Sequence, residues 1–288
     1  MKKNKKILNY WNLRANNKLL KCTNDINLEK NEIKYFLSII KKKTNVLDIG
    51  CGDGELLRTL KKNNKCNCYG IDFSENLISV AKKKSKNINY YCMDMNKIKD
   101  QFKTNIKFDY IITKRSIQNL TSWTNQKKFL NQLKFFSALK TKILLMESSS
   151  DGLKKINYVR QKLNLKKINK PWHNLYLDDK KVKKTIFKGI KLIGISELFS
   201  AYYFTSRVLN AAINEKPTYN DLLNLNILTY GIKMNRIIIN AEITQYVQNN
   251  KLLIAPLKNP KCSIKAKIIS IEHRPTNEYI RPLTIRFL

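Results

Sequence analysis

Histidine, glycine and acidic residues are scarce in this chain of 288 residues, and each shortage excludes a class of protein. Two His and six Cys, with no Cys-x-x-Cys pair, offer no ligand spacing for zinc. Eight Gly exclude a collagen-like chain, and no apolar run approaches the ~20 residues of a membrane-spanning helix. The basic start Met1–Lys6 is followed by an amphipathic stretch, Ile7–Leu20, which lacks the apolar core of a signal peptide. We therefore expect a cytoplasmic protein with reduced thiols, no metal and no membrane insertion.

Acidic side chains number 21 against 56 Lys and Arg, so the net charge is +35. Such an excess favours a polyanionic partner, either nucleic acid or an anionic surface. Arg is the basic residue best suited to bidentate contacts with phosphate and guanine, but only nine of the basic residues are Arg. The Lys residues are spread along the whole chain instead of forming one cluster. Lys, Asn and Ile are abundant together, as the codons of an AT-rich genome would produce. We favour compositional drift and keep a nucleic-acid partner as the less favoured alternative.

Short apolar runs alternate with helical patterns over the first half of the chain, after a largely helical stretch at residues 1–43. The expected strands are Asn45–Ile49, Cys68–Ile71, Asn89–Cys92, Phe108–Thr113 and Lys142–Met146. The expected helices among them are Glu55–Leu60, Ser74–Lys84, which has a predicted N-cap at Ser74, and Gln126–Leu139. This alternation predicts an α/β fold of Rossmann-like type, in which helices cover both faces of a mostly parallel sheet.

Beyond Glu147 the pattern is less regular. We expect helices at Leu153–Leu165 and Lys180–Phe187, and strands at Ile190–Leu198 and Ile237–Ile243. The last part of the chain, 241–288, contains two or three short β patterns within residues 244–288, one of them at Pro282–Phe287. We expect a small C-terminal β-rich extension there, either a β appendage, a dimer contact or a poorly ordered tail.

Three of the few glycines follow the first strand, in Asp48-Ile49-Gly50-Cys51-Gly52-Asp53-Gly54. A strand, a tight glycine turn and the start of a helix let a ligand approach bare backbone at a helix N-terminus. A pyrophosphate would favour a loop free of negative charge, whereas Asp48 and Asp53 flank this one. Carboxylates suit a ligand that carries an ammonium and a sulfonium, as S-adenosyl-L-methionine (SAM) does. The alternative is that these glycines serve packing alone.

Carboxylates also follow the second and third strands. Asp72 lies 22 residues after Gly50, where nucleoside-binding domains place a carboxylate for the ribose hydroxyls. Asp94 can accept a hydrogen bond from the amine of adenine, and Met95 offers a backbone N–H and an apolar edge. Because ligands of open α/β sheets bind outside the carboxyl ends of the strands, we expect one shared site. A helix-capping or exposed role for Asp72 is the alternative.

The segments Asp48–Gly54, Asp72 and Asp94 together resemble the first three motifs of the class I SAM-dependent methyltransferases. Phe108–Thr113 resembles their fourth strand, and the resemblance covers roughly residues 10–240. It implies a seven-stranded sheet with an antiparallel last hairpin, and SAM lying across the carboxyl ends of the first four strands.

The resemblance also implies roles for single residues. Asp72 would bind the ribose and Asp94 the adenine, while Gly50 and Gly52 would line the methionine part of SAM. We count Asp48, Phe73 and Met95 among the cofactor-binding residues with them.

Two arginines complete the expected cofactor site. Trp11-Asn12-Leu13-Arg14-Ala15 is similar to an N-terminal segment of some members whose Arg reaches the methionine carboxylate, although a solvated Arg14 is the alternative. Arg115 lies in Lys114–Leu120, after the fourth strand, where the family often contacts cofactor and substrate. This segment lacks the Asn/Asp-Pro-Pro-aromatic motif used on exocyclic base amines, which argues against a nucleic-acid substrate.

A last resemblance concerns the methyl acceptor. Asp151–Leu153 and Pro171–Tyr176 resemble a stretch in bacterial small-molecule methyltransferases, often linked to sugars and surface polysaccharides. His173 is the candidate general base, with a structural His as the alternative, and Trp172 and Tyr176 are candidate walls of a substrate pocket.

We therefore expect a methyltransferase domain at residues 1–240, with substrate-covering insertions around 115–130 and 151–180. It would transfer a methyl group from SAM to an oxygen or nitrogen of a small molecule, such as a sugar or a polysaccharide precursor. The alternatives are an RNA or protein methyltransferase recruited by the positive charge, and a non-catalytic domain that binds SAM or a partner protein.

Overall fold

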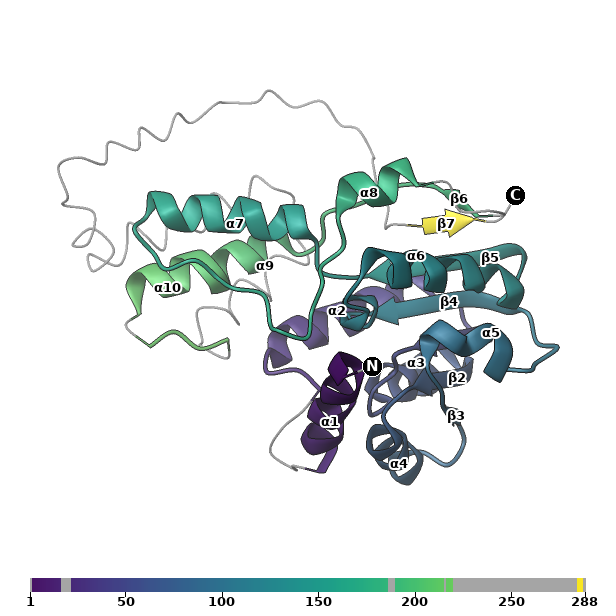
Figure 1. Ribbon diagram of the computed structural model, residues 1–288. Helices are drawn as coiled ribbons and strands as arrows, with labels where there is room; N and C mark the ends of the chain where they lie inside the picture. The colour runs from purple at the N-terminus through teal and green to yellow at the C-terminus, as the bar shows by residue number, and fades with distance from the viewer. Residues whose placement is uncertain (1, 17–21, 186–189, 215, 220–283, 287–288) are drawn as a thin grey trace.

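Figure 1 shows the computed structural model, which describes residues 2–16, 22–185, 190–214, 216–219 and 284–286. Its centre is a parallel sheet of five strands in the order β3-β2-β1-β4-β5. These strands are β1 (Asn45–Ile49), β2 (Asn67–Asp72), β3 (Asn89–Cys92), β4 (Phe108–Lys114) and β5 (Ser137–Met146). Each contains the strand expected from its apolar run, so the predicted Rossmann-like parallel sheet is confirmed.

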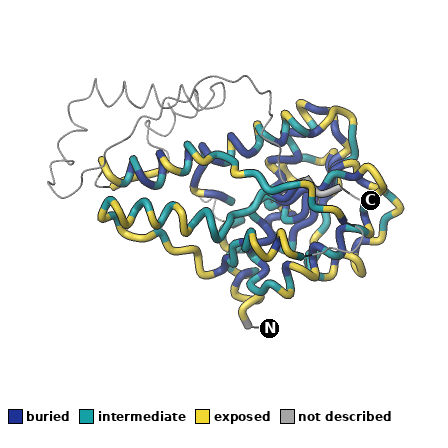
Figure 2. Tube along the Cα trace, turned by 90° about the horizontal axis from the view of Figure 1, so that it is seen from above, coloured by how far each residue is buried: buried dark blue, intermediate teal, exposed yellow. Residues whose placement is uncertain are grey.

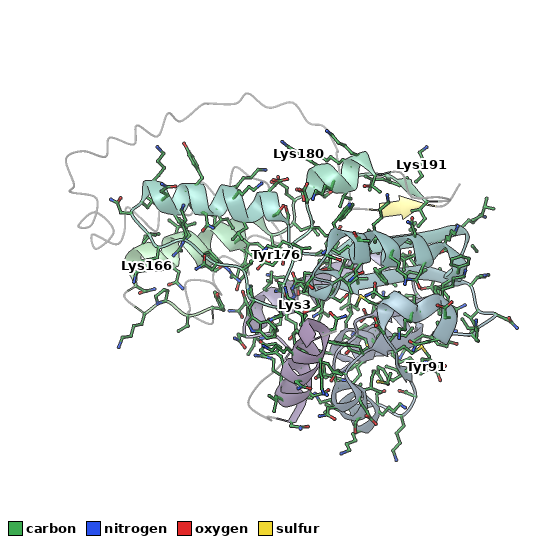
Figure 3. All side chains as sticks on the ribbon, in the orientation of Figure 1. Lys3, Tyr91, Lys166, Tyr176, Lys180 and Lys191 are labelled. Atoms are coloured by element: carbon green, nitrogen blue, oxygen red, sulfur yellow. The ribbon has the colours of Figure 1, made fainter. Side chains whose placement is uncertain are left out.

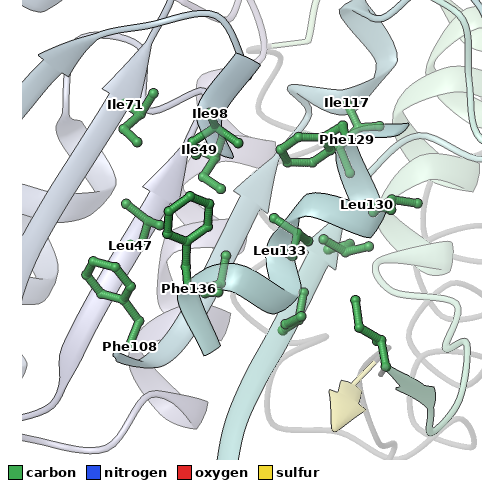
Figure 4. Packing of buried hydrophobic residues seen from close by; sticks show 14 of the residues in the cluster. Leu47, Ile49, Ile71, Ile98, Phe108, Ile117, Phe129, Leu130, Leu133 and Phe136 are labelled. Carbon is green, nitrogen blue, oxygen red and sulfur yellow. The ribbon is translucent and has the colours of Figure 1, made fainter. Parts of the chain in front are cut away.

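Helices cover both faces of the sheet, because alternate residues of each strand point to opposite sides. On one face Leu47 and Ile49 of β1 pack in a cluster with Phe129 and Leu133 (Figure 4). On the other face Val46 lies in a separate cluster, with residues of α2 (Ile26–Ile39), α3 (Glu55–Asn64) and α4 (Glu75–Lys84). Figure 2 shows the buried residues gathered in the interior of the molecule, with exposed residues on the outer turns of the trace.

Local signals set most helix boundaries. The hydroxyl oxygen of Ser74 accepts a hydrogen bond from the Leu77 amide at 3.2 Å, which confirms the predicted N-cap of α4. The helix expected at Gln126–Leu139 is wrong at its end: α6 (Trp123–Gln132) passes into a 3₁₀ turn, and β5 begins at Ser137. Thr141 is the reason, because its hydroxyl bonds the carbonyl of Phe108 and joins the early part of β5 to β4.

Two short strands lie beyond β5 at the edge of the sheet. β7 (Thr284–Arg286) pairs antiparallel with both β5 and β6 (Lys191–Leu192). The strand expected at Ile190–Leu198 is thus mostly wrong, because β6 has two residues, whose partners in β7 are Arg286 and Ile285. The strand expected at Ile237–Ile243 and most of the extension at 241–288 lie outside the described residues.

The described residues form six further helices. They are α1 (Lys2–Asn16), α5 (Ile98–Gln101), α7 (Ser150–Lys162), α8 (Asp179–Lys184), α9 (Ser200–Phe204) and α10 (Asn210–Ile213), with a π-helical turn at Thr205–Leu209. In Figure 1, α7, α9 and α10 lie side by side, and α1 lies near α4. Among the described residues, no helix is long and apolar enough to cross a membrane.

Candidate cofactor site and active site

The glycine loop after β1 adopts backbone conformations that favour glycine. Gly50, Gly52 and Gly54 have φ angles of +83°, +56° and +79°. At Gly50 an added Cβ would lie 2.2 Å from the Cβ of Ser116, so no side chain fits there. The Gly50 amide donates to the carbonyl of Ile71 at 2.7 Å, which fixes the loop against β2. The loop therefore presents bare backbone at the carboxyl end of β1.

Asp72 connects this loop to α4. Its Oδ2 accepts from the Gly52 amide and its Oδ1 from the Ser74 amide, both at 2.9 Å. The carboxyl is 7% exposed, and burial raises its pKa to about 6, against the opposing effect of the backbone hydrogen bonds. Asp72 is thus both a structural link and a carboxylate that lines the cleft.

Asp48 lies beneath the glycine loop and is 1% exposed. Its Oδ1 has no hydrogen-bond partner among the described residues, and burial raises its pKa to about 7, opposed by the charge of Lys114. It also lines the larger of two cavities at this edge of the sheet. A buried carboxylate without a partner fits a positively charged ligand group at this position.

The first cavity lies at the ends of β2 and β3. Ile71, Phe73, Met93 and Met95 give it apolar walls, and Asp94 adds a carboxylate. The Oδ1 of Asp94 accepts from the Asn96 amide at 2.9 Å. The fold therefore brings the expected adenine-side residues together around one pocket, which α1 helps to close.

The second cavity, of about 320 Å³, continues from the first toward Glu29 of α2 and Arg207 of the π-helical turn. Described residues that line both cavities are Gly50, Asp72, Phe73, Met95 and Asn119. Tyr10 and Arg14 of α1, together with His173, line only the second.

Hydrogen bonds hold α1 over both cavities. The Ser74 hydroxyl lies 2.6 Å from the Oδ1 of Asn12, and the indole N–H of Trp11 donates to Asn119 at 3.3 Å. The guanidinium of Arg14 donates to the Oδ1 of Asn24 at 2.9 Å and faces the Tyr10 ring at 5.8 Å. Arg14 is therefore held in the cavity wall rather than in bulk solvent.

Arg115 is placed differently from the other expected cofactor residues. It follows β4 with a φ of +55°, and its Nη2 lies 3.0 Å from the Oε2 of Glu32, a buried residue of α2. Its Nη1 donates to Thr23 at 3.0 Å. Arg115 lines the second cavity, but its charge is paired with a carboxylate that the sequence analysis did not single out.

His173 is 6% exposed and lies among aromatic rings. Its ring centroid is 4.5 Å from that of Tyr10, and its Nδ1 has no partner within the described part of the chain. Burial, with a smaller effect of the Arg14 charge, lowers its pKa, so the imidazole is neutral at pH 7. Trp172 and Tyr176, expected as pocket walls, are not among the described residues that line the cavity, and Trp172 is 54% exposed.

Glu147 is a positioning residue that was not predicted from the sequence, and it is not among the described residues that line either cavity. Its Oε1 accepts from the Ser116 and Ile117 amides at 3.0 and 3.1 Å, so it fixes the loop that packs on Gly50. Burial raises its pKa to about 7. The sequence did contain a signal for Glu147, because it directly follows β5, just as Asp72 ends β2 and Asp94 follows β3.

Comparisons with known proteins agree with this geometry. A family model described as "Methyltransferase domain" matches residues 40–191. The chain is 38% identical over 90 residues to a ubiquinone biosynthesis O-methyltransferase of Coxiella burnetii, which is 30% of this chain and 36% of that protein. It is 31% identical over 98 residues to an uncharacterized protein of Methanocaldococcus jannaschii, which is 33% of this chain and 45% of that protein. The chain thus spans less than half the length of these curated relatives.

Two solved structures are similar in part. The N-methyltransferase NodS from Bradyrhizobium japonicum, in complex with S-adenosyl-L-homocysteine (SAH), matches with a TM-score of 0.41 and 18% identity over 49% of this chain and 71% of NodS. A methyltransferase of Haloferax volcanii, solved with the activator Trm112, matches with a TM-score of 0.47 and 12% identity over 66% of this chain and 81% of that one. The family model alone covers more than half of the chain. The chain therefore belongs to the class I SAM-dependent methyltransferases, whose cofactor is SAM.

Proposed function

We propose that this protein transfers the methyl group of SAM to an oxygen or nitrogen of a small molecule. The observation that carries the proposal is that two cavities meet at Gly50 and Asp72. Direct methyl transfer needs cofactor and acceptor held in contact and in line, and the protein contributes mainly this alignment. One cavity has the apolar walls that suit adenine, and the other has room for an acceptor.

We propose that the expected cofactor residues bind SAM, which their positions around the two cavities support. We assign the ribose hydroxyls to Asp72, and the adenine to the pocket of Phe73, Asp94 and Met95. A carboxylate that already accepts from backbone amides keeps further lone pairs for hydroxyl donors, so the structural bonds of Asp72 leave room for this role.

The methionine part of SAM is assigned to the larger cavity. Gly50 and Gly52 present backbone to it, and the unpartnered carboxylate of Asp48 suits the ammonium. Arg14 suits the carboxylate, because a guanidinium binds carboxylates in a bidentate way. We place Arg115 at the acceptor side of the same cavity, where its pairing with Glu32 makes it a weaker cofactor ligand.

His173 is proposed as the general base. SAM supplies an electrophilic methyl group when it is bound. A hydroxyl nucleophile must lose a proton as its bond to the methyl carbon forms, and a neutral imidazole with an unpartnered Nδ1 can accept that proton. The relative named as an O-methyltransferase is consistent with an oxygen acceptor.

We further propose that the methyltransferase domain spans residues 1–240, with 241–288 as an extension whose β7 supplies the seventh strand of the sheet. The pairing of β7 with β5 and β6 gives the end of this extension a place at the sheet edge. The segments 115–130 and 151–180 cover the acceptor, which is supported by Gln118 and His173 in the cavity wall. A sugar or polysaccharide precursor is the acceptor class that we propose, with a cytoplasmic location.

Calorimetric titration with SAM and SAH tests the proposal. We expect micromolar affinity in the unmodified protein and at least a tenfold loss in Asp72→Asn. Asp100→Asn is the matched control, because Asp100 is exposed and lines neither cavity. A folded protein that binds neither compound would refute the proposal. Tight SAM binding without turnover of sugars or other small metabolites would instead favour a non-catalytic binding domain.

A further inference from the structure

Most lysines in the described part of the chain are exposed on its outer surface. Lys3, Lys166, Lys180 and Lys191, all labelled in Figure 3, are exposed and lie on the outside of the molecule. None of the four lines either cavity. The net charge of +35 therefore says little about the charge that a bound acceptor meets.

Inside the second cavity, three cationic side chains are each matched by a carboxylate. The pairs are Lys114–Glu29 at 2.9 Å, Arg115–Glu32 at 3.0 Å and Arg207–Asp25 at 2.6 Å. All six side chains are at most 22% exposed. A neighbouring carboxylate thus balances the charge of each of these cations and weakens its attraction for a phosphate or carboxylate group. Arg14, which also lines this cavity, is assigned to the methionine carboxylate of SAM under the proposed function.

Three neighbouring polar side chains of the same wall, in contrast to these ion pairs, each have a polar atom without a hydrogen-bond partner among the described residues. Gln118, His173 and Asn174 are 8%, 6% and 8% exposed, and each has a buried polar atom that no described residue satisfies. The Leu175 amide donates to the Gln118 carbonyl at 2.6 Å, which holds the segment with His173 and Asn174 beside Gln118. Buried polar atoms without partners are costly, so their presence in a cavity wall points to a ligand that supplies the missing hydrogen bonds.

From these two observations we infer that the methyl acceptor is an electrically neutral molecule rich in hydroxyl groups, bound by the side-chain amides of Gln118 and Asn174. An amide both donates and accepts, as a hydroxyl does, so the two groups are complementary. This inference rests on the proposed function and narrows its acceptor class to unphosphorylated, non-acidic polyols such as neutral sugars.

The reaction then balances without a further reagent. A bond forms between an acceptor hydroxyl oxygen and the methyl carbon, and the bond from that carbon to the sulfonium breaks. Its electron pair stays on sulfur, which leaves neutral SAH. The hydroxyl proton passes to the imidazole of His173, so charge is conserved overall.

Phosphate binding tests the matched charges. SAH-loaded protein is titrated with inorganic phosphate by calorimetry in 0.15 M NaCl, as unmodified protein, as Glu32→Gln and as Glu197→Gln. We expect a saturable phosphate site only in Glu32→Gln, at least tenfold tighter than the weak background that the others share. Glu197→Gln is the matched control, because it frees Lys155 on the exposed surface. Asp25→Asn, which keeps the N-cap of α2 and frees Arg207, replaces Glu32→Gln if that variant does not fold.

The outcomes separate this inference from the proposed function. Failure of SAH to bind refutes the proposed function before phosphate is added. A saturable phosphate site in the unmodified, SAH-loaded protein would overturn the neutral acceptor. A Glu32→Gln protein that is folded but gains no site would remove the charge-matching argument, and the proposal with it.

Thermal melting of the ligand-free protein tests the amides. We expect Gln118→Met and Asn174→Leu to leave the melting temperature unchanged or higher, because each removes an unsatisfied buried group. Gln132→Met is the matched control: this buried amide accepts from the Lys99 amide and donates to Asn96, so its loss should lower the melting temperature by roughly 4 °C or more. An equal loss in Gln118→Met would show a structural partner and overturn the acceptor contact.

Discussion

The affinity for SAM should fall as the pH drops below 6, because Asp72 must be ionised to hold the cofactor. In the ligand-free protein burial raises the pKa of this carboxyl to about 6. Protonation removes an acceptor for the ribose hydroxyls and weakens the bond from the Gly52 amide, which shapes the loop. Binding therefore favours the carboxylate and releases a proton at low pH.

The size of the effect follows from the pKa of Asp72. At pH 5 a carboxyl with a pKa of about 6 is ionised in about one molecule in eleven, so the affinity should be ~10-fold weaker than at pH 8. The pKa of Asp48 is raised to about 7. If this carboxylate faces the SAM ammonium, the affinity for SAM should continue to increase with pH up to about pH 7.

Calorimetry at pH 5, 6, 7 and 8, in pairs of buffers with different ionisation enthalpies, measures both the affinity and the protons released. Asp72→Asn should bind weakly at every pH and release fewer protons at pH 5, whereas Asp100→Asn should follow the unmodified protein. Equal SAM affinity at pH 5 and pH 8, in protein that circular dichroism shows to be folded, would refute the role given to Asp72.

Two further predictions concern stability. Gly50→Ala should lower the free energy of unfolding by at least ~1 kcal/mol and abolish SAM binding, because it forces a positive φ on Ala and a clash with Ser116. Gly152→Ala in α7, whose Cβ would meet only ordinary contacts, should be neutral or stabilising in the same urea melts, and equal losses would contradict the argument. In the folded protein the pKa values of Asp48 and Glu147 are raised to about 7, from ordinary values of 3.8 and 4.5. The folded state therefore holds these two protons more tightly than the unfolded chain does. Their contribution to stability is full below pH ~4 and is lost as the pH rises through 7, because both groups must then be ionised in a buried place. Asp48→Asn should therefore raise the melting temperature of the ligand-free protein at pH 8 while weakening SAM binding, and a lower melting temperature at pH 8 would contradict this.

The strands and the glycine loop were predictable because their signals are local. An apolar run of four to seven residues predicts a buried parallel strand wherever it occurs, and Gly50 predicts a tight turn from its own position after β1. The start of β5 was missed because it depends on a bond from Thr141 to Phe108, 33 residues away.

The walls of the second cavity were harder to predict, because they also depend on contacts between residues that lie far apart in the sequence. Glu32 lies within an ordinary helical pattern, and nothing near it in sequence indicates that it is buried against Arg115. Arg207 likewise forms its ion pair with Asp25, which lies 182 residues earlier in the chain. Pairings of this kind become visible only when the tertiary fold is known.

The position of α1 links the two ligands. Its residues Ile7 and Tyr10 line the first and the second cavity respectively, so under the proposed function this one helix contributes to the binding surfaces of both molecules. Whichever ligand binds first restricts this helix, and the entropy lost in that step need not be lost again when the second ligand binds. SAM and the acceptor should therefore strengthen each other's binding, and by linkage the coupling must be equal in both directions.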